Sequence, residues 1–395
     1  MFGSRWWRVK ASSVSATILR GSLMYATLMG IICFSVESDG IDGRLVARNR
    51  KWYKWFCLIS RILMCGLYIQ IYRHFIFFLN TSHFTIILVF RVCIYIACAI
   101  FTLVIQLWYG QRVVDLVNRF LRLFQRIHAL PGCQDMGYGG KWVLGLLLLK
   151  GIGLVYESLY VIPSLISDMD NYFYLITICD FYNTANASII LHVNFVAYVS
   201  IGIIYDQVNS YVRHELRQQL SELNSSNGLP VSRRKLKAAG HCLDECLAIY
   251  EEVHQLGNTF HRLFEFPLCI FLLFGFLSIA SIAFIIMLNL YMGMRLWLLA
   301  IKVALDVLLL TVAVHIASCN SRVVRRLSLE SFYISDNKDW HIKLEMFLNR
   351  LNYYEFRVRP LGLFEVSNNL ILVFMSGLVT YLTYIMQYDM QSNQI

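Results

Sequence analysis

Apolar residues gather in eight long stretches along the chain, and this pattern predicts a protein that crosses a membrane several times. Each stretch approaches the roughly 20 residues that a helix needs to cross about 30 Å of hydrocarbon. The stretches cover residues 14–35, 55–79, 84–108, 143–166, 174–205, 266–291, 295–318 and 368–388. Which of them span the membrane depends on the polar connections between them.

These connections are either long and basic or very short, and the difference orients the chain. Cytoplasmic loops collect Lys and Arg, so we expect the long connections inside the cell and the short ones outside. The long connections are 109–142, 206–265 and 319–367, and the short ones are 80–83, 167–173 and 292–294. The last residues, 389–395, then form an extracellular tail.

Only one of the first two stretches fits this alternation. If 14–35 crossed and 55–79 did not, residues 36–83 would carry seven basic side chains outside. If 55–79 crosses instead, residues 1–54 stay in the cytoplasm and no Lys or Arg is left in an outer loop. The stretch 14–35 is then expected to be re-entrant or to lie in the membrane interface.

We therefore predict an all-α polytopic membrane protein with seven transmembrane helices, an intracellular N-terminus and an extracellular C-terminus. The seven spans form one membrane domain over residues 55–388. Apolar side chains also recur at helical spacing in the inner connections, over 112–130, 235–258 and 339–353. These patterns predict cytosolic helices that pack on one another as an anchor bundle, or that lie on the lipid surface.

Composition agrees with a membrane protein, because 57% of the 395 residues are hydrophobic and 15% are charged. Average globular chains carry about 25% charged residues, so an ordinary soluble domain is excluded. The net charge of +10 could indicate a nucleic-acid or anionic-lipid partner. Since Lys and Arg are concentrated in the predicted inner segments, we expect contact with membrane lipid and no nucleic-acid partner.

The sequence has no pattern typical of an enzyme or of a cofactor site. H-E-x-x-H, G-x-S-x-G and G-x-x-x-x-G-K-[ST] are all absent. Cys242 and Cys246 beside His241 imitate a metal site, but the same spacing puts the two thiols one turn apart on a predicted cytoplasmic helix. We predict no enzymatic activity, no metal and no cofactor.

Polar side chains within the predicted spans are costly in lipid and are therefore candidates for ligand binding. They are Tyr156, Glu157, Tyr160, Asp180, Tyr182, Asn183, Asn186, Trp297, Lys302 and Asp306. Other interpretations stay open: interhelical hydrogen bonds in span 174–205, mutual neutralisation of Lys302 and Asp306 four residues apart, and the preference of Tyr and Trp for membrane interfaces.

The last span, 368–388, carries a polar face in its outer half. Its polar side chains that share one helical face are Thr380, Tyr381, Tyr384, Gln387 and Tyr388. Several copies of such a helix around a symmetry axis could enclose a water-filled pore that a single copy cannot. The alternative is a polar face buried within the monomer.

Two motifs near the C-terminus resemble a known family. Thr380-Tyr381, five residues and then Gln387-Tyr388 are similar to the T-Y-(x5)-Q-F signature that ends insect gustatory receptors, with Tyr in place of Phe. The preceding segment Gly362-Leu363-Phe364-Glu365 resembles the G-L-F-[DE] segment that opens the last helix of the same family. The length and the predicted topology extend the resemblance over the whole chain.

This resemblance implies a tastant-gated, nonselective cation channel in the plasma membrane of gustatory receptor neurons, with the dendrite as the expected site. It implies a homo- or hetero-tetramer with related subunits, a tastant pocket in the outer half of each subunit, and a pore lined by the seventh helices. Tyr384, Gln387 and Tyr388 fall on pore and gate positions. Leu382 stands where sugar-receptor members tend to have Glu, so bitter compounds are the expected small-molecule tastants.

Two other classes of protein provide alternatives. A seven-helix receptor signalling through G proteins would place the N-terminus outside, and the sequence has neither a D-R-Y-like motif after the third span nor N-P-x-x-Y in the seventh. A secondary transporter would show related halves or helices broken at mid-membrane, and the sequence has no such repeat.

Overall fold

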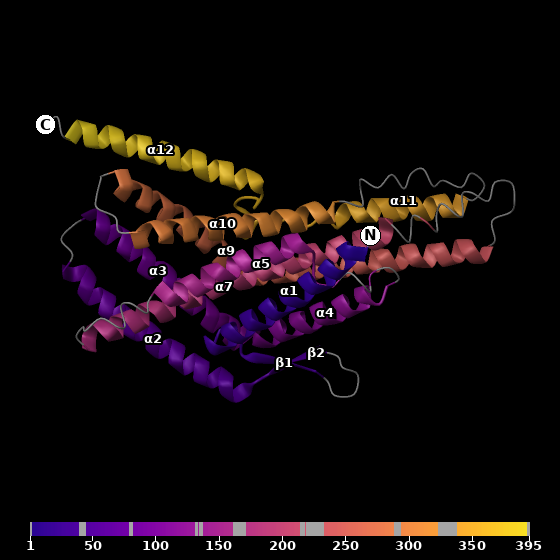
Figure 1. Ribbon diagram of the computed structural model, residues 1–395, viewed down its shortest axis with the longest axis horizontal. Coiled ribbons are helices and arrows are strands. Elements are labelled where there is room, and N and C mark those ends of the chain that lie inside the picture. The colour runs from indigo at the N-terminus through magenta and orange to yellow at the C-terminus, as the bar shows by residue number, and fades with distance from the viewer. Residues whose placement is uncertain are drawn as a thin grey trace.

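The computed structural model is an elongated array of helices (Figure 1). It describes residues 2–38, 45–78, 82–130, 133, 137–160, 171–213, 218, 233–287, 294–322 and 338–392. Helices α2, α3 and α12 lie toward one end of the long axis, and α11 with the beginning of α9 lies toward the other end. The C-terminus is at the first of these ends.

The described elements are almost all helical. The helices are α1 (Phe2–Leu28), α2 (Lys51–Phe78), α3 (Ser82–Val104), α4 (Gly110–His128), α5 (Lys141–Tyr160), α7 (Asn171–Tyr211), α9 (Arg233–Met287), α10 (Met294–Ser321), α11 (Lys338–Tyr353) and α12 (Asn368–Ser392). A π-helical segment, Ile105–Tyr109, joins α3 to α4, and a 3-10 turn covers Pro360–Gly362. The strands are β1 (Phe34–Ser38) and β2 (Leu45–Asn49).

Five helical segments of the described chain are long and apolar enough to cross a membrane. They are Lys51–Arg73, Val92–His128, Phe173–Tyr211, Leu236–Leu277 and Ile301–Ser321, and Asn368–Tyr381 is a shorter apolar helix. The structure is therefore that of a largely helical membrane protein. The count of seven spans and the sides on which the termini lie stay predictions.

The segment between α1 and α2 differs from the all-α prediction. The stretch 14–35 begins within α1, but this helix ends at Leu28, and the chain then forms an antiparallel hairpin in which Phe34 pairs with Asn49 and Ser38 with Leu45. Asn118 of α4 binds both backbone groups of Ala47, with N–O distances of 2.7 and 3.2 Å. The hairpin is thus held against α4 as well as by its own ladder.

Two predicted spans are parts of much longer helices. α9 has 55 residues, which at 1.5 Å per residue correspond to about 80 Å, well over the thickness of a bilayer. It joins the predicted cytosolic helix 235–258 to the predicted span 266–291 without a break at Pro267. α7 similarly extends the span 174–205 to Tyr211. Both helices therefore continue without interruption from a predicted span into a predicted inner connection.

The core is centred on α7, which packs most closely against α10. A side chain at Gly202 would lie 3.2 Å from Ile316 and 3.4 Å from the backbone of Ala317, so the missing side chain permits the close approach. Asn320 donates a hydrogen bond to the carbonyl of Gly202 (2.9 Å), and Asn209 donates one to the carbonyl of Asn320 (2.8 Å). A glycine therefore permits the close approach of the two helices, and asparagine side chains bond them together.

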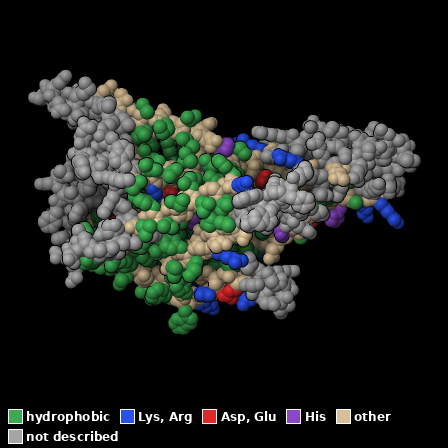
Figure 2. All heavy atoms as spheres, in the orientation of Figure 1, with side chains coloured by type: hydrophobic (Ala, Val, Ile, Leu, Met, Phe, Trp, Pro, Cys, Tyr) green, Lys and Arg blue, Asp and Glu red, His purple; other side chains and the backbone are tan. Residues whose placement is uncertain are grey.

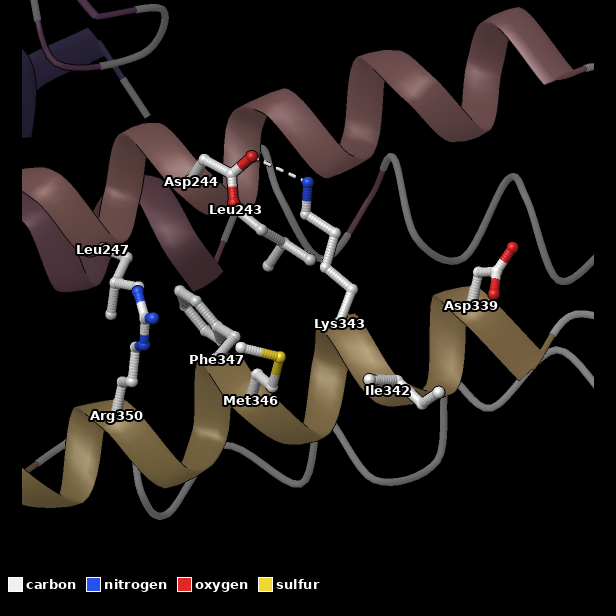
Figure 3. Close-up of a pocket in the computed structure, with 9 residues that line it drawn as sticks. All are labelled: Leu243, Asp244, Leu247, Asp339, Ile342, Lys343, Met346, Phe347 and Arg350. Atoms are coloured by element: carbon white, nitrogen blue, oxygen red, sulfur yellow. Dashed lines mark hydrogen bonds and ion pairs between the residues drawn. The ribbon is translucent and has the colours of Figure 1, made fainter.

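The amphipathic helix predicted over 339–353 packs on another part of the same chain, as α11 on α9. In α11, the predicted apolar face of Trp340, Leu344, Phe347 and Leu351 is buried. Figure 3 shows this helix against α9, with Phe347 between them and Lys343 reaching Asp244 at 2.7 Å. A cavity of about 270 Å³ remains beside this contact. Packing within the chain thus covers the apolar stripe of α11.

Candidate functional site

Polar side chains of α7 lie within the bundle rather than on its surface. Most of this helix is apolar, yet the buried groups along it include Asn183, Asn186, Ser188, His192 and Asn194. Polar groups at this depth are stable only when they have partners in the protein or line a wet cavity. The partners of these side chains therefore show whether they serve packing or are available to a ligand.

The strongest cluster joins α5, α7 and α10 around one carboxylate. Asp306 accepts from Lys150 of α5 at 2.5 Å and from Lys302, one turn before it in α10, at 3.0 Å. Lys302 also donates to Ser188 of α7 at 3.2 Å. The side chains of Lys150, Asp306 and Lys302 are 2%, 9% and 13% exposed. Two buried cations thus share one buried anion.

This cluster confirms one prediction and adds a residue that the sequence analysis did not select. The contact between Lys302 and Asp306 is present, as their spacing indicates. Lys150 is not among the ligand-binding residues that the sequence predicts. A lysine inside the apolar stretch 143–166 was the available signal, since such a residue requires a partner.

His192 lies one helical turn after Ser188 on α7 and is almost completely buried. Neither of its ring nitrogens has a hydrogen-bond partner among the described residues. A buried imidazole without a partner is costly unless water or a ligand supplies the missing hydrogen bond. His192 is therefore a polar group that is available to a ligand beside the charged cluster.

A second buried network holds the turn that follows α1. Arg61 of α2 is fully buried and donates to the carbonyl of Gly30 (3.1 Å), the carbonyl of Met29 (3.4 Å) and the side-chain oxygen of Asn186 (3.1 Å). Gln106 donates to the same Gly30 carbonyl. Asn186, a predicted ligand residue, therefore joins α7 to this turn.

Two other candidates on α7, Asp180 and Asn183, also form hydrogen bonds within the chain. Asp180 accepts a hydrogen bond of 3.0 Å from Tyr72 of α2, and Asn183 donates to the carbonyl of Cys179 in its own helix at 2.9 Å. Tyr182 and Tyr156 are partly buried. The interpretation as interhelical hydrogen bonding therefore holds for Asp180 and Asn186, while Asn183 satisfies its own helix.

Four predicted site residues fall outside the described side chains. The side chains of Glu157, Tyr160, Trp297 and Tyr388 lie outside the part of the chain that the structure describes. The structure places Asn186 of α7 against Arg61 of α2. It places Lys302 and Asp306 of α10 against α7 and α5. Whether any of these residues contacts a ligand stays a prediction.

Helix α12 differs from the rest because its polar side chains are exposed. It packs through Phe374 on Phe276 of α9, with ring centroids 5.5 Å apart, and Figure 1 shows it along one edge of the array. Tyr384 is 68% exposed and Tyr381 is 41% exposed. Thr380 and Gln387 are exposed as well. Within one subunit, these side chains are therefore not buried.

Comparisons with known proteins agree in pointing to one group. The family model of the 7tm chemosensory receptors matches residues 19–392. The chain is 41% identical over 393 residues to a putative gustatory receptor 93c of Drosophila melanogaster, covering 98% of each chain. It is 38% identical over 388 residues to a putative gustatory receptor 93b of the same organism, covering 98% of this chain and 97% of the relative. A gustatory receptor for bitter taste 93a from that organism is 23% identical over 310 residues, which are 73% of this chain and 71% of the relative.

Proposed function

Because the chain belongs to the gustatory receptors of the 7tm chemosensory receptor family, which are receptors and not enzymes, we propose that it is a tastant-gated, nonselective cation channel. In this proposal the tastant is a small molecule and the receptor acts in the plasma membrane of gustatory receptor neurons. The pore forms where the α12 helices of four identical or related subunits meet.

The exposed polar end of α12 is the observation that carries the channel proposal. Lipid does not solvate a face that carries Thr380, Tyr384 and Gln387, and the subunit itself leaves these side chains exposed. Around a symmetry axis, copies of this face would contact one another and the water in the pore. Tyr384 and Tyr388, one turn apart, would then narrow the path, and the Gln387 amides would offer uncharged ligands to cations.

Tastant binding is proposed for the region around α7 and α10. His192 offers unpartnered ring nitrogens there, and Lys302, Asp306 and Asn186 lie on the surrounding helices. A few polar groups within an apolar surrounding are what a small-molecule site requires. Bitter compounds are the proposed class, since Leu382 departs from the sugar-receptor pattern and one relative is named for bitter taste.

A physical link joins this region to the proposed pore. α10 carries Lys302 and Asp306 and packs against both α7 and α12, while Phe276 of α9 packs on Phe374 of α12. A tastant can shift gating only through different affinities for the closed and open states. Binding that displaces α10 relative to α7 would have such an effect, because α12 rests on the same helix.

Recording currents from the purified protein in liposomes without any G protein tests the proposal. Tyr384→Ala is expected to change unitary conductance or basal opening more than tastant potency, because the side chain is assigned to the pore and not to the ligand. Tyr353→Ala is the matched control, since Tyr353 is 81% exposed at the end of α11.

Three outcomes would contradict parts of the proposal. Absence of tastant-evoked current in liposomes, with responses restored only by a G protein, would favour the G-protein-coupled alternative. Equal effects of Tyr384→Ala and Tyr353→Ala on conductance and basal opening would contradict the proposal that α12 lines the pore. An N-terminal epitope tag that is accessible without permeabilisation would overturn the predicted orientation.

A further inference from the structure

Helix α2 has one face packed into the bundle and one apolar face exposed. Cys57, Leu58 and Arg61 are buried, whereas Phe56, Ile59, Ile62 and Leu63 are exposed. The exposed set recurs every three or four residues and so forms a continuous stripe along the helix. A stripe of this kind requires hydrocarbon around it, so this side of α2 faces lipid.

The stripe ends in two tryptophans at the beginning of the helix. Trp52 is 92% exposed and Trp55 is 60% exposed, and both continue the apolar face by helical spacing. Tryptophan prefers the boundary between hydrocarbon and headgroups. The first turns of α2 therefore mark the level at which lipid headgroups lie.

Basic side chains surround these tryptophans. Among the described residues of the hairpin and the first two turns of α2, the basic ones are Arg48, Arg50, Lys51 and Lys54, and the acidic one is Glu37. Glu37 pairs with Arg50 at 3.5 Å. Lys51 and Lys54 have no ion pair within the described chain. Figure 2 shows Lys and Arg side chains gathered at the lower edge of the molecule, beside the hydrophobic surface.

The backbone that carries these charges is held in place before any lipid binds. The amide of Arg50 donates to the carbonyl of Cys33 at 3.0 Å, and the hydroxyl of Tyr53 donates to the carbonyl of Thr27. Asn118 fixes β2 through Ala47. Because the groups are already positioned, a ligand loses little free energy in ordering them.

We propose that Lys51, Lys54, Arg48 and Arg50, with Trp52 and Trp55 beside them, form a binding site for anionic phospholipid headgroups. The lysine ammonium groups neutralise the headgroup phosphate and carboxylate, while the tryptophans and the stripe on α2 contact the acyl chains. Such a lipid would lie on the cytoplasmic side and would tie the hairpin and the start of α2 to the membrane surface. This inference does not depend on the protein conducting ions.

Native mass spectrometry of the purified full-length protein, titrated with phosphatidylserine or with phosphatidylcholine of the same acyl chains, tests the site. We expect phosphatidylserine to bind more tightly than phosphatidylcholine. Each basic residue near an anionic headgroup contributes about a fivefold change in affinity. The affinity of Lys51→Gln/Lys54→Gln for phosphatidylserine should therefore fall about 5- to 25-fold, and its affinity for phosphatidylcholine should change little.

The controls separate this site from general charge effects. Lys237→Gln/Lys338→Gln removes the same charge from exposed positions in α9 and α11 and should retain wild-type affinity, as should Lys51→Arg/Lys54→Arg. Equal affinity of the wild type for both lipids, no loss in Lys51→Gln/Lys54→Gln, or an equal loss in the distant pair would overturn the proposal. Competition by glycerophosphoserine as strong as by the intact lipid would also overturn it, because the site would then recognise a soluble headgroup.

Discussion

Asp306→Asn tests whether the charged cluster stabilises the membrane bundle. In the wild type, the carboxylate lies 2.5 Å from the ammonium of Lys150 and 3.0 Å from that of Lys302. The variant keeps the size of the side chain and removes its charge. Two buried ammonium groups then lose their shared counter-ion and face each other across a neutral amide.

The size of the effect follows from the burial of the groups. Removing one partner of a buried ion pair costs about 3–5 kcal/mol, because the remaining charge stays desolvated. With an unfolding entropy of about 2.1 cal/mol/K per residue, a chain of 395 residues has about 0.8 kcal/mol/K in total. The expected fall in Tm is therefore about 4–6 °C.

Lys302→Met is the comparison that makes the test specific. It leaves one buried cation, Lys150, opposite the single carboxylate at 2.5 Å, so no buried charge loses its counter-ion and its Tm should fall clearly less than that of Asp306→Asn. Adding Lys150→Met to Asp306→Asn removes one of the two cations that lose their counter-ion and should restore part of the lost stability. Thermal unfolding of the detergent-solubilised protein, followed with a thiol-reactive dye, measures all three. A role of the cluster in stability is refuted if Asp306→Asn has the Tm of the wild type, or if Lys302→Met lowers the Tm by as much as Asp306→Asn does.

Three further predictions concern the packing of the subunit. Gly202→Val should lower stability by about 1–3 kcal/mol in thermal unfolding, because its side chain would meet Ile316 and Ala317, whereas Gly145→Ala, with no atom within 4 Å, should be neutral or stabilising. Equal effects would argue against close packing of α7 on α10. Arg61→Ala should lower the free energy of unfolding by about 2–4 kcal/mol, since the carbonyls of Met29 and Gly30 lose a charged donor. The turn after α1 should then become accessible to protease, and an unchanged rate of cleavage there would contradict this prediction. Asn118→Ala should speed amide hydrogen exchange at Ala47 about five- to tenfold, because both backbone partners of that residue are lost, and unchanged exchange there would exclude the anchoring role of Asn118.

Much of the candidate site depended on partners that sequence spacing does not show. The contact of Lys302 with Asp306 could be predicted, because residues four apart share a helix face. Lys150 and Ser188 come from helices distant in sequence, and only packing brings them to the same carboxylate. The same holds for Arg61, whose partners lie 31 and 125 residues away.

The hairpin could have been predicted from its local sequence. Val36 and Val46 lie on either side of two Asp-Gly pairs, at 39–40 and 42–43, and this combination is typical of a β-hairpin. The apolar stretch 14–35 concealed the signal, because hydropathy alone does not distinguish the end of a helix from the beginning of a buried strand.

Hydrophobic patterning by itself determined that this protein is a helical membrane protein, and the C-terminal motifs placed it in its family. These are properties of local composition, since every segment of about 20 apolar residues must leave water whatever its neighbours are. Tertiary structure alone decided that polar side chains of α7 are buried within the bundle while those of α12 are exposed. Both helices carry polar side chains, and these differ in burial because α7 is surrounded by other helices, whereas α12 lies along the edge with one face uncovered.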